Sequence, residues 1–116
     1  NWSFIIKGSK EEVKSDNALF GSCITFIDSS LIDVNFDIKN TKCLDAIKFI
    51  RTKGSINRIM ISNSDGDGLA ADYSQMKIRN IYIKDSNDDC INFKKGEYVI
   101  NKIQKEFTLI VVLCVL

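Results

Sequence analysis

Apolar residues recur along the middle of the chain in blocks of four, at intervals of 22 or 23 residues. Each block contains a small residue, an aliphatic residue, a variable residue and then Phe or Ala. The four copies are Cys23–Phe26, Ala46–Phe49, Gly68–Ala71 and Cys90–Phe93. A second apolar block lies between these copies, as Phe36–Ile38, Ile59–Ile61 and Ile81–Ile83. The constant interval indicates that the chain is built from internal repeats.

Within each block the apolar residues alternate with a period of two, which is typical of β-strands. Each strand has too few apolar residues to form a core alone, but stacked copies bury them together. We therefore predict an all-β fold, a right-handed parallel β-helix with four to five coils of about 22 residues. A column is defined here as the residues at one position in successive coils. The predicted inward columns are Ile24/Ile47/Leu69/Ile91, Phe26/Phe49/Ala71/Phe93, Phe36/Ile59/Ile81 and Ile38/Ile61/Ile83.

Other positions follow from the same alignment of repeats. Ala71 interrupts the Phe column, and Tyr73 is expected to fill the space beneath Phe49. The predicted outward column is Thr25/Lys48/Ala70/Asn92. The glycines expected between strands are Gly54, Gly66, Gly68 and Gly96. The column Asn40/Asn63/Asp85, beside Thr41/Ser64/Ser86, is expected to bond the backbone of adjacent coils at a turn.

The repeat divides the chain into three parts. Residues 1–21 are expected to form a strand and cap region, in which Gly8–Ser15 begins either a short capping helix or a surface loop. Residues 22–103 hold the repeats, and residues 104–116 form an atypical tail. Its ten residues 107–116 are too few for a membrane span, which needs about 20. They are a final strand, a shortened span or the product of a frame error. No membrane span is expected within this chain, and further coils of a longer parent chain are expected beside it.

Composition narrows the classes of function. The 16 Lys and Arg against 15 Asp and Glu give a net charge of +1, which argues against nucleic-acid binding. The absence of His excludes Ser-His-Asp, Cys-His and His-ligated zinc sites. Cys23 and Cys90 occupy equivalent small-residue positions and are expected to be packed thiols, with a Cys23–Cys43 bridge as the alternative.

An acidic column is the main candidate site. Asp45, Asp67 and Asp89 each precede a small residue, and stacking would place their carboxylates about 5 Å apart. One interpretation is a calcium-binding or glycan-binding edge, because clustered carboxylate oxygens suit hard cations. The other interpretation is that each Asp accepts backbone N–H bonds at a turn. If a metal binds, the candidate ligands are Asp65, Asp67 and Asp89.

Two further patterns are weaker. The segment Asn63–Gly68 matches the start of a calcium loop, but Ser74 stands where that loop has Glu. A polysaccharide lyase would need a basic residue near a bound cation. Arg51, Arg58 and Arg79 are the candidates, but the three do not share one column.

Residues 22–103 resemble the right-handed parallel β-helix repeats of bacterial surface and secreted proteins, within the pectate-lyase-like superfamily. They also resemble repeats that accompany spore-coat-kinase-like domains. The segments that carry the resemblance are Cys43–Ile50, Ser64–Ser74 and Asn87–Phe93. The resemblance implies a fold and little about chemistry, because many functions share it.

These observations favour a non-catalytic module of an extracellular or cell-surface bacterial protein, whose flat faces bind polysaccharide or another surface protein. The alternative is a carbohydrate-active enzyme of the lyase, hydrolase or epimerase type, or a fragment of one. In that alternative the Asp column is the acid-base or cation site. No catalytic residue is assigned, and calcium is the one cofactor considered.

Overall fold

The structure, a computed structural model, describes residues 3–7 and 21–103, and these residues form strands connected by turns. The strands are β1 (Ser3–Lys7), β2 (Ser22–Ile27), β3 (Ser30–Thr41), β4 (Asp45–Ile50), β5 (Lys53–Ser64), β6 (Asp67–Asp72), β7 (Gln75–Ser86), β8 (Ile91–Lys94) and β9 (Glu97–Ile103). Among the described residues no helix is long and apolar enough to span a membrane. The predicted cap Gly8–Ser15 and tail 104–116 lie outside the described residues.

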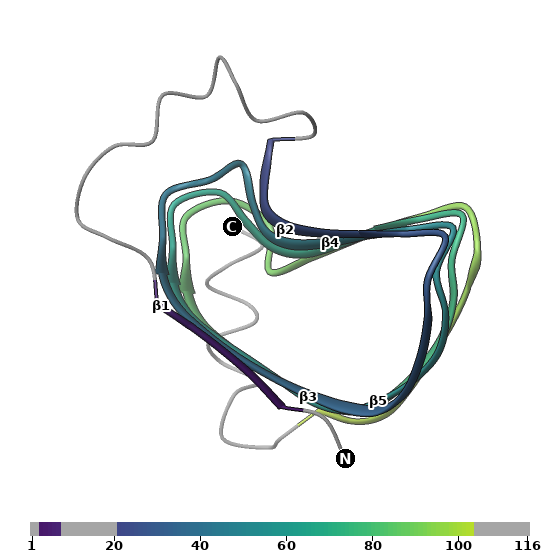
Figure 1. Ribbon diagram of the computed structural model, residues 1–116. Helices are drawn as coiled ribbons and strands as arrows, with labels where there is room; N and C mark the ends of the chain where they lie inside the picture. The colour runs from purple at the N-terminus through teal and green to yellow at the C-terminus, as the bar shows by residue number, and fades with distance from the viewer. Residues whose placement is uncertain (1–2, 8–20, 104–116) are drawn as a thin grey trace.

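The strands form two parallel sheets, and each coil contributes one strand to each sheet. The long-strand sheet has the order β1-β3-β5-β7-β9, and the short-strand sheet has the order β2-β4-β6-β8. Each strand pairs with its counterpart in the next coil, so successive coils superimpose when viewed along the stack (Figure 1). The predicted parallel β-helix with coils of about 22 residues is therefore confirmed.

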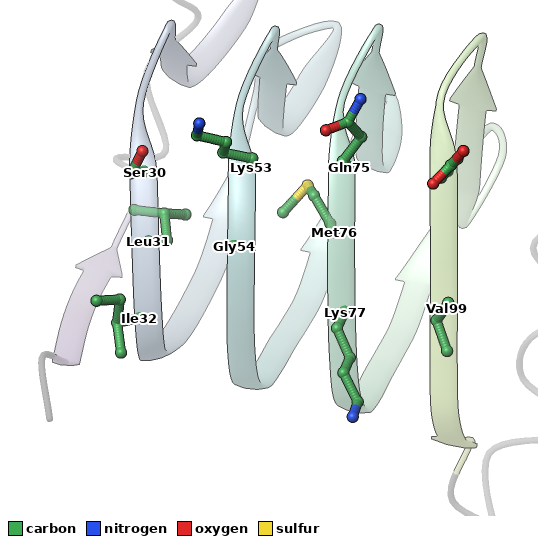
Figure 2. A pocket seen from close by; sticks show the side chains of 10 residues that line it. Ser30, Leu31, Ile32, Lys53, Gly54, Gln75, Met76, Lys77 and Val99 are labelled. Atoms are coloured by element: carbon green, nitrogen blue, oxygen red, sulfur yellow. The ribbon is translucent and has the colours of Figure 1, made fainter.

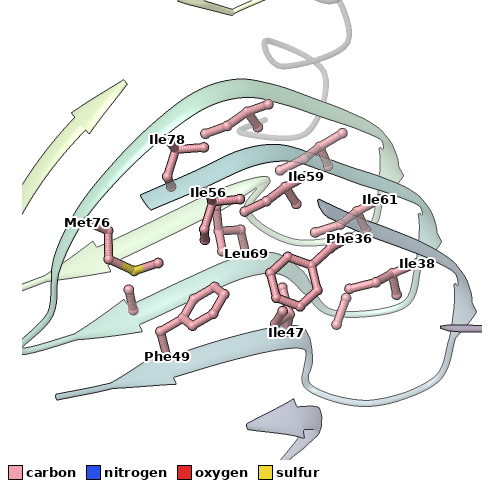
Figure 3. Close-up of a cluster of buried hydrophobic side chains, with 14 of the residues drawn as sticks. Phe36, Ile38, Ile47, Phe49, Ile56, Ile59, Ile61, Leu69, Met76 and Ile78 are labelled. Atoms are coloured by element: carbon pink, nitrogen blue, oxygen red, sulfur yellow. The ribbon is translucent and has the colours of Figure 1, made fainter. Parts of the chain in front are cut away.

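The four predicted inward columns are also confirmed. Strand pairing aligns Ile24 with Ile47, Phe36 with Ile59, and so on through the stack. In the middle coils these side chains are almost completely buried and pack as one core (Figure 3). Within one column the rings of Phe26 and Phe49 stack with centroids 5.5 Å apart, and Phe36 from the neighbouring column meets Phe49 edge to face. Burial of these stacked columns holds the coils together.

The long strands bury two further columns that the repeat alignment did not include as columns. They are Val34/Ile56/Ile78/Ile100 and Leu31/Gly54/Met76/Tyr98. A shift of register between Leu31 and Asn35 separates the two columns on β3. The short apolar blocks therefore mark only the second half of each long strand.

Three predictions about individual residues are wrong. Tyr73 does not fill the core, because it is 60 % exposed, with the Lys95 Nζ 5.6 Å from the centre of its ring. Gly54 and Gly68 lie inside β5 and β6, whereas Gly66 and Gly96 do lie between strands. A Cβ on Gly54 would overlap the carbonyl oxygen of Leu31, so the close approach of two coils explains this glycine.

The turn residues adopt a left-handed backbone that repeats from coil to coil. Asn40, Asn63 and Asp85 have φ of 58°, 59° and 58°, a conformation that Asn and Asp tolerate better than other residues. The Asn63 amide donates to the Asn40 side chain at 2.8 Å, so these two bond each other rather than backbone. The neighbouring Ser86 hydroxyl does bond the adjacent coil, donating to the Gly66 carbonyl at 2.8 Å.

The cysteines differ from the expected packed thiols. Cys23 is exposed and forms a disulfide with Cys43, and the two Cα atoms are 5.4 Å apart. The alternative bridge between the first two full coils is thus the correct one. Cys90 is completely buried as expected, but it is disulfide-bonded rather than a free thiol.

Candidate functional site

The outer face of the short-strand sheet has a hollow centred on Ala70. Ala70 belongs to the outward column Thr25/Lys48/Ala70/Asn92, where the flanking coils carry the longer Lys48 and Asn92. The missing side-chain length leaves a volume of about 280 Å³, which we call the Ala70 hollow. Ala70 itself is only 5 % exposed because its neighbours project around it. The hollow is lined by Leu44, Asp45, Lys48, Asp67, Ala70, Ala71, Asp72, Asp88, Asn92 and Lys94.

Asp45 and Asp67 open β4 and β6 and pair in register, as the repeat predicted. Asp45 is 9 % exposed, and the Ser22 hydroxyl donates to its carboxylate at 3.2 Å. Burial, and then the nearby charge of Asp67, raises the pKa of Asp45 above its ordinary value. The two carboxylates therefore differ in environment although they occupy the same column.

Asp67 is held in place by the next coil. Its two carboxylate oxygens accept hydrogen bonds from the backbone N–H of Asp89 and from the Asn92 side-chain amide, each at 3.1 Å. Asp67 thus makes the backbone contact of the structural interpretation and still lines the Ala70 hollow. Asn92 lines the same hollow and fixes one oxygen of Asp67. The sequence had already indicated the position of Asn92 in the outward column.

The carboxylates of Asp67, Asp88 and Asp89 come together, with one oxygen from each lying within 4.8 Å of the others. Asp88 is exposed, and repulsion from Asp67 is the first cause that raises its pKa. These are hard oxygen donors of the kind calcium takes, although calcium takes six to eight oxygens. Asp65 is not in this group; its carboxylate pairs with the Lys42 ammonium at 3.4 Å.

Sequence reasoning missed Asp88. Its counterparts one and two coils earlier are Gly66 and Leu44, so no repeated residue type identifies the position. Only the fold brings Asp88 beside Asp67, and its N–H donates to the Gly66 carbonyl at 3.4 Å. An acidic substitution in a single coil gives no periodic signal.

Positive charge also lines the Ala70 hollow. The Lys48 ammonium lies 3.4 Å from the Asp72 carboxylate, and both side chains are about three-quarters buried. Lys94 adds a second ammonium at the rim. The hollow therefore presents carboxylates, an amide and ammoniums around a methyl-lined floor, which offers donors and acceptors in several directions.

A second hollow lies on the outer face of the long-strand sheet, around Gly54 (Figure 2). We call it the Gly54 hollow; its volume is about 530 Å³. Leu31 and Met76 flank the glycine, and the exposed Ile32 and Val99 lie on either side. Most of its polar residues, including Lys53 and Glu97, are the first residues of their strands, and Lys77 is the third residue of β7. It is larger than the Ala70 hollow but has fewer converging charged groups, so the Ala70 hollow is the better candidate for specific binding.

The three arginines considered for lyase chemistry lie at different places in the coil. Arg51 occupies a turn and donates to both carboxylate oxygens of Asp28, at 2.7 and 3.1 Å. Arg58 lies in the column of Asn35 and Asn80 on the long-strand sheet, and Arg79 lies on the neighbouring strand one position before Asn80. None of the three lines the Ala70 hollow.

Comparison of the chain with protein-family models, with curated proteins and with solved structures gave no match.

Proposed function

We propose that this chain is a non-catalytic β-helix module of a bacterial surface or secreted protein, and that it binds glycan at the Ala70 hollow. The observation that carries the proposal is the hollow's set of groups. Asp67, Asn92 and Lys48 offer acceptors and donors for sugar hydroxyls, and Ala70 offers an apolar floor for a sugar ring. A volume of about 280 Å³ lies just below the range of about 300–1,000 Å³ that is common for small-molecule sites.

The geometry of the stack supports a chain-like ligand. Neighbouring coils repeat about every 4.8 Å along the axis, so outward side chains from several coils form one continuous face. Lys94, from the last coil described, extends the polar groups beyond Asp67 and Ala70. A ligand with repeating hydroxyls would reach side chains of successive coils at regular intervals along this face.

The disulfide supports the proposed location outside the cell. Cys23 is exposed, and Cys23–Cys43 joins two coils that the strand pairing already aligns. Such bonds persist mainly in oxidising compartments. A surface or secreted setting therefore suits both the disulfide and an accessible outer face.

A specific observation also favours the alternative, a glycan-cleaving enzyme. Asp45 has a raised pKa and lies beside Asp67, whose carboxylate accepts two hydrogen bonds. Glycoside hydrolysis uses two carboxyl groups in different surroundings, one of which has a raised pKa. Asp45 is nevertheless largely buried and bonded by Ser22, which leaves it little access to a substrate.

Titration with neutral, anionic and amino-bearing oligosaccharides, followed by calorimetry, tests the proposal. Ala70→Gln fills the hollow and is expected to weaken glycan binding by about tenfold or more. This factor corresponds to the loss of one hydrogen bond with the ligand. Thr25→Gln is the matched control, because it lengthens the same outward column outside the hollow. Equal affinity of the two variants would show that the hollow is not the site.

The same mixtures distinguish the two functions. Chromatography of the oligosaccharides after long incubation is expected to show no shortened products. Products that disappear in Asp45→Asn would support the enzyme instead. Absence of binding by every class of oligosaccharide would contradict the glycan proposal.

A further inference from the structure

The chain contains two Asp-Gly steps two residues apart, Asp65–Gly66 and Asp67–Gly68. Such steps permit attack of the glycine backbone nitrogen on the carboxyl carbon of the preceding aspartate, because glycine has no Cβ to hinder the approach. The two steps share composition and solvent, so their surroundings alone decide which of them reacts.

The two reacting groups at Asp65 are less restrained than those at Asp67, although the Asp65 N–H donates to the Thr41 carbonyl at 3.0 Å. It lies in the bend between β5 and β6, its side chain is 42 % exposed, and the ion pair with Lys42 is at the surface. The Gly66 N–H, which is the attacking group, donates no hydrogen bond to any described residue. Neither the nucleophile nor the carboxyl is therefore fixed by the core.

The surroundings of Asp67 prevent the same rearrangement. Asp67 and Gly68 belong to β6, and both carboxylate oxygens of Asp67 are bonded by Asp89 and Asn92. The Gly68 N–H donates to the Asp89 carbonyl at 2.9 Å. Attack at this step would require all three hydrogen bonds to break and the strand to leave the sheet.

We propose that Asp65 is a site of spontaneous succinimide formation, through which it converts to isoaspartate, while Asp67 is protected. The Gly66 nitrogen forms a bond to the Asp65 Cγ and loses its proton, and the carboxyl oxygen leaves as water. Water then adds to one carbonyl of the succinimide. Addition at the Cγ carbonyl restores Asp65, whereas addition at the former backbone carbonyl gives isoaspartate. The water lost is regained, and no electron is transferred.

The product would alter the edge of the Ala70 hollow. Isoaspartate adds one methylene to the main chain next to Gly66, whose carbonyl accepts from the Ser86 hydroxyl and from the Asp88 N–H. A Cβ on Gly66 would overlap the Leu44 carbonyl oxygen, so the turn has no spare room on that side. The modification is therefore expected to move Gly66 and, with it, Asp88.

Incubation of the intact folded protein in oxygen-18 water at neutral pH tests the proposal, because each cycle of closure and opening incorporates heavy oxygen. Trypsin releases both steps in one peptide, Ile59–Lys77, and fragmentation assigns the label to each aspartate. We expect at least about tenfold more label at Asp65 than at Asp67, which is the factor that one net hydrogen bond supplies. In denaturant, the two positions are expected to label alike.

Asp65→Glu is the matched control, because its longer side chain does not form the five-membered ring and keeps the charge that pairs with Lys42. It is expected to abolish label at position 65 and methylation of the aged protein by an isoaspartyl methyltransferase. Equal label at both aspartates in the folded protein would overturn the proposal. Label in denaturant but none at Asp65 in the folded protein would also overturn it.

Discussion

Each coil contributes a strand to both sheets, yet the residue types within a column vary less in one sheet than in the other. In the long-strand sheet the inward positions are almost all Ile or another large apolar residue, as in Phe36/Ile59/Ile81 and Ile38/Ile61/Ile83. In the short-strand sheet a large residue is followed by a small one, as at Phe49 and Ala71, and the outward column changes from Lys48 to Ala70. Apart from the column Leu31/Gly54/Met76/Tyr98, the inward columns of the long-strand sheet repeat one kind of residue, whereas the short-strand sheet varies.

This difference separates stability from specificity. Ile59, Ile61 and Ile81 are almost completely buried, so their contribution comes from the apolar surface they remove from water. The short-strand sheet carries the disulfide, the half-buried carboxylates and the Ala70 hollow. A face that varies between coils provides a local site, because identical coils would offer no position that differs from the others.

Truncation of the long-strand sheet should have the largest effect. Ile59→Ala removes a fully buried side chain between Phe36 and Ile81 and leaves a cavity in the core. We expect a loss of about 2–5 kcal/mol in the free energy of unfolding, measured by urea titration. Ile32→Ala, on the same sheet but 77 % exposed, is the control and is expected to change stability by about 0.5 kcal/mol or less.

A loss below about 1 kcal/mol for Ile59→Ala would contradict the role given to the long-strand sheet. An equal loss of unfolding free energy in Ile59→Ala and Ile32→Ala would also contradict it. Either result would show that burial in this sheet does not control the stability of the stack.

The repeat predicted the core of this fold because burial acts on every coil alike. Ile24, Ile47, Leu69 and Ile91 were assigned to one column from spacing alone, and strand pairing confirms that column. Two kinds of residue escaped the same reasoning. Gly54 is needed for a close approach between backbones, and Tyr73 occupies a turn, and neither property appears in a pattern of apolar residues.

Loss of the disulfide should have the next largest effect, and it acts on the short-strand sheet. The Cys23→Ser, Cys43→Ser double variant releases a cross-link between residues 20 apart in the sequence. Because the cross-link restricts the unfolded chain, we expect a loss of about 3 kcal/mol in the free energy of unfolding. Urea titration of the oxidised protein and of the oxidised double variant measures this loss, whereas the reduced protein also lacks the bond of Cys90 and gives the effect of both cross-links.

The reduced protein and the double variant should retain the far-ultraviolet circular dichroism of the folded chain. Strand pairing of β2 with β4, and the bonds from Leu44 and Asp45 to the Gly21 carbonyl, remain without the disulfide. Loss of the β-spectrum in both samples would mean that the bond is required to form the first coils rather than to stabilise them.

The candidate site was only partly predictable. The sequence indicated Asp45 and Asp67 because an Asp precedes the small residue of each coil after the first. The structure pairs these two residues in register. Asp88 and the hollow over Ala70 were not found, because each depends on a single departure from the repeat. A periodic pattern indicates which residues stack in successive coils. A site formed by one unusual coil is found only from the three-dimensional structure.

The smallest effect we predict is a pH dependence that arises at Asp45 in the short-strand sheet. Burial and the charge of Asp67 raise the pKa of Asp45 in the folded protein above its value in the unfolded chain. The folded state therefore holds this proton to higher pH than the unfolded state does. The stability that follows is complete below the unfolded value, near 4, and is lost as pH rises through the folded pKa.

Asp45→Asn cannot ionise, and its side-chain oxygen can still accept from the Ser22 hydroxyl. We therefore expect the variant to match the natural chain at low pH and to be the more stable of the two at neutral pH, measured by urea titration across that range. Ser22→Ala should steepen the pH dependence, because the hydrogen bond from Ser22 lowers the pKa of Asp45. If Asp45→Asn were instead the less stable chain at neutral pH, the ionised carboxylate would be a stabilising group. The short-strand sheet would then share the purely structural role of the long-strand sheet.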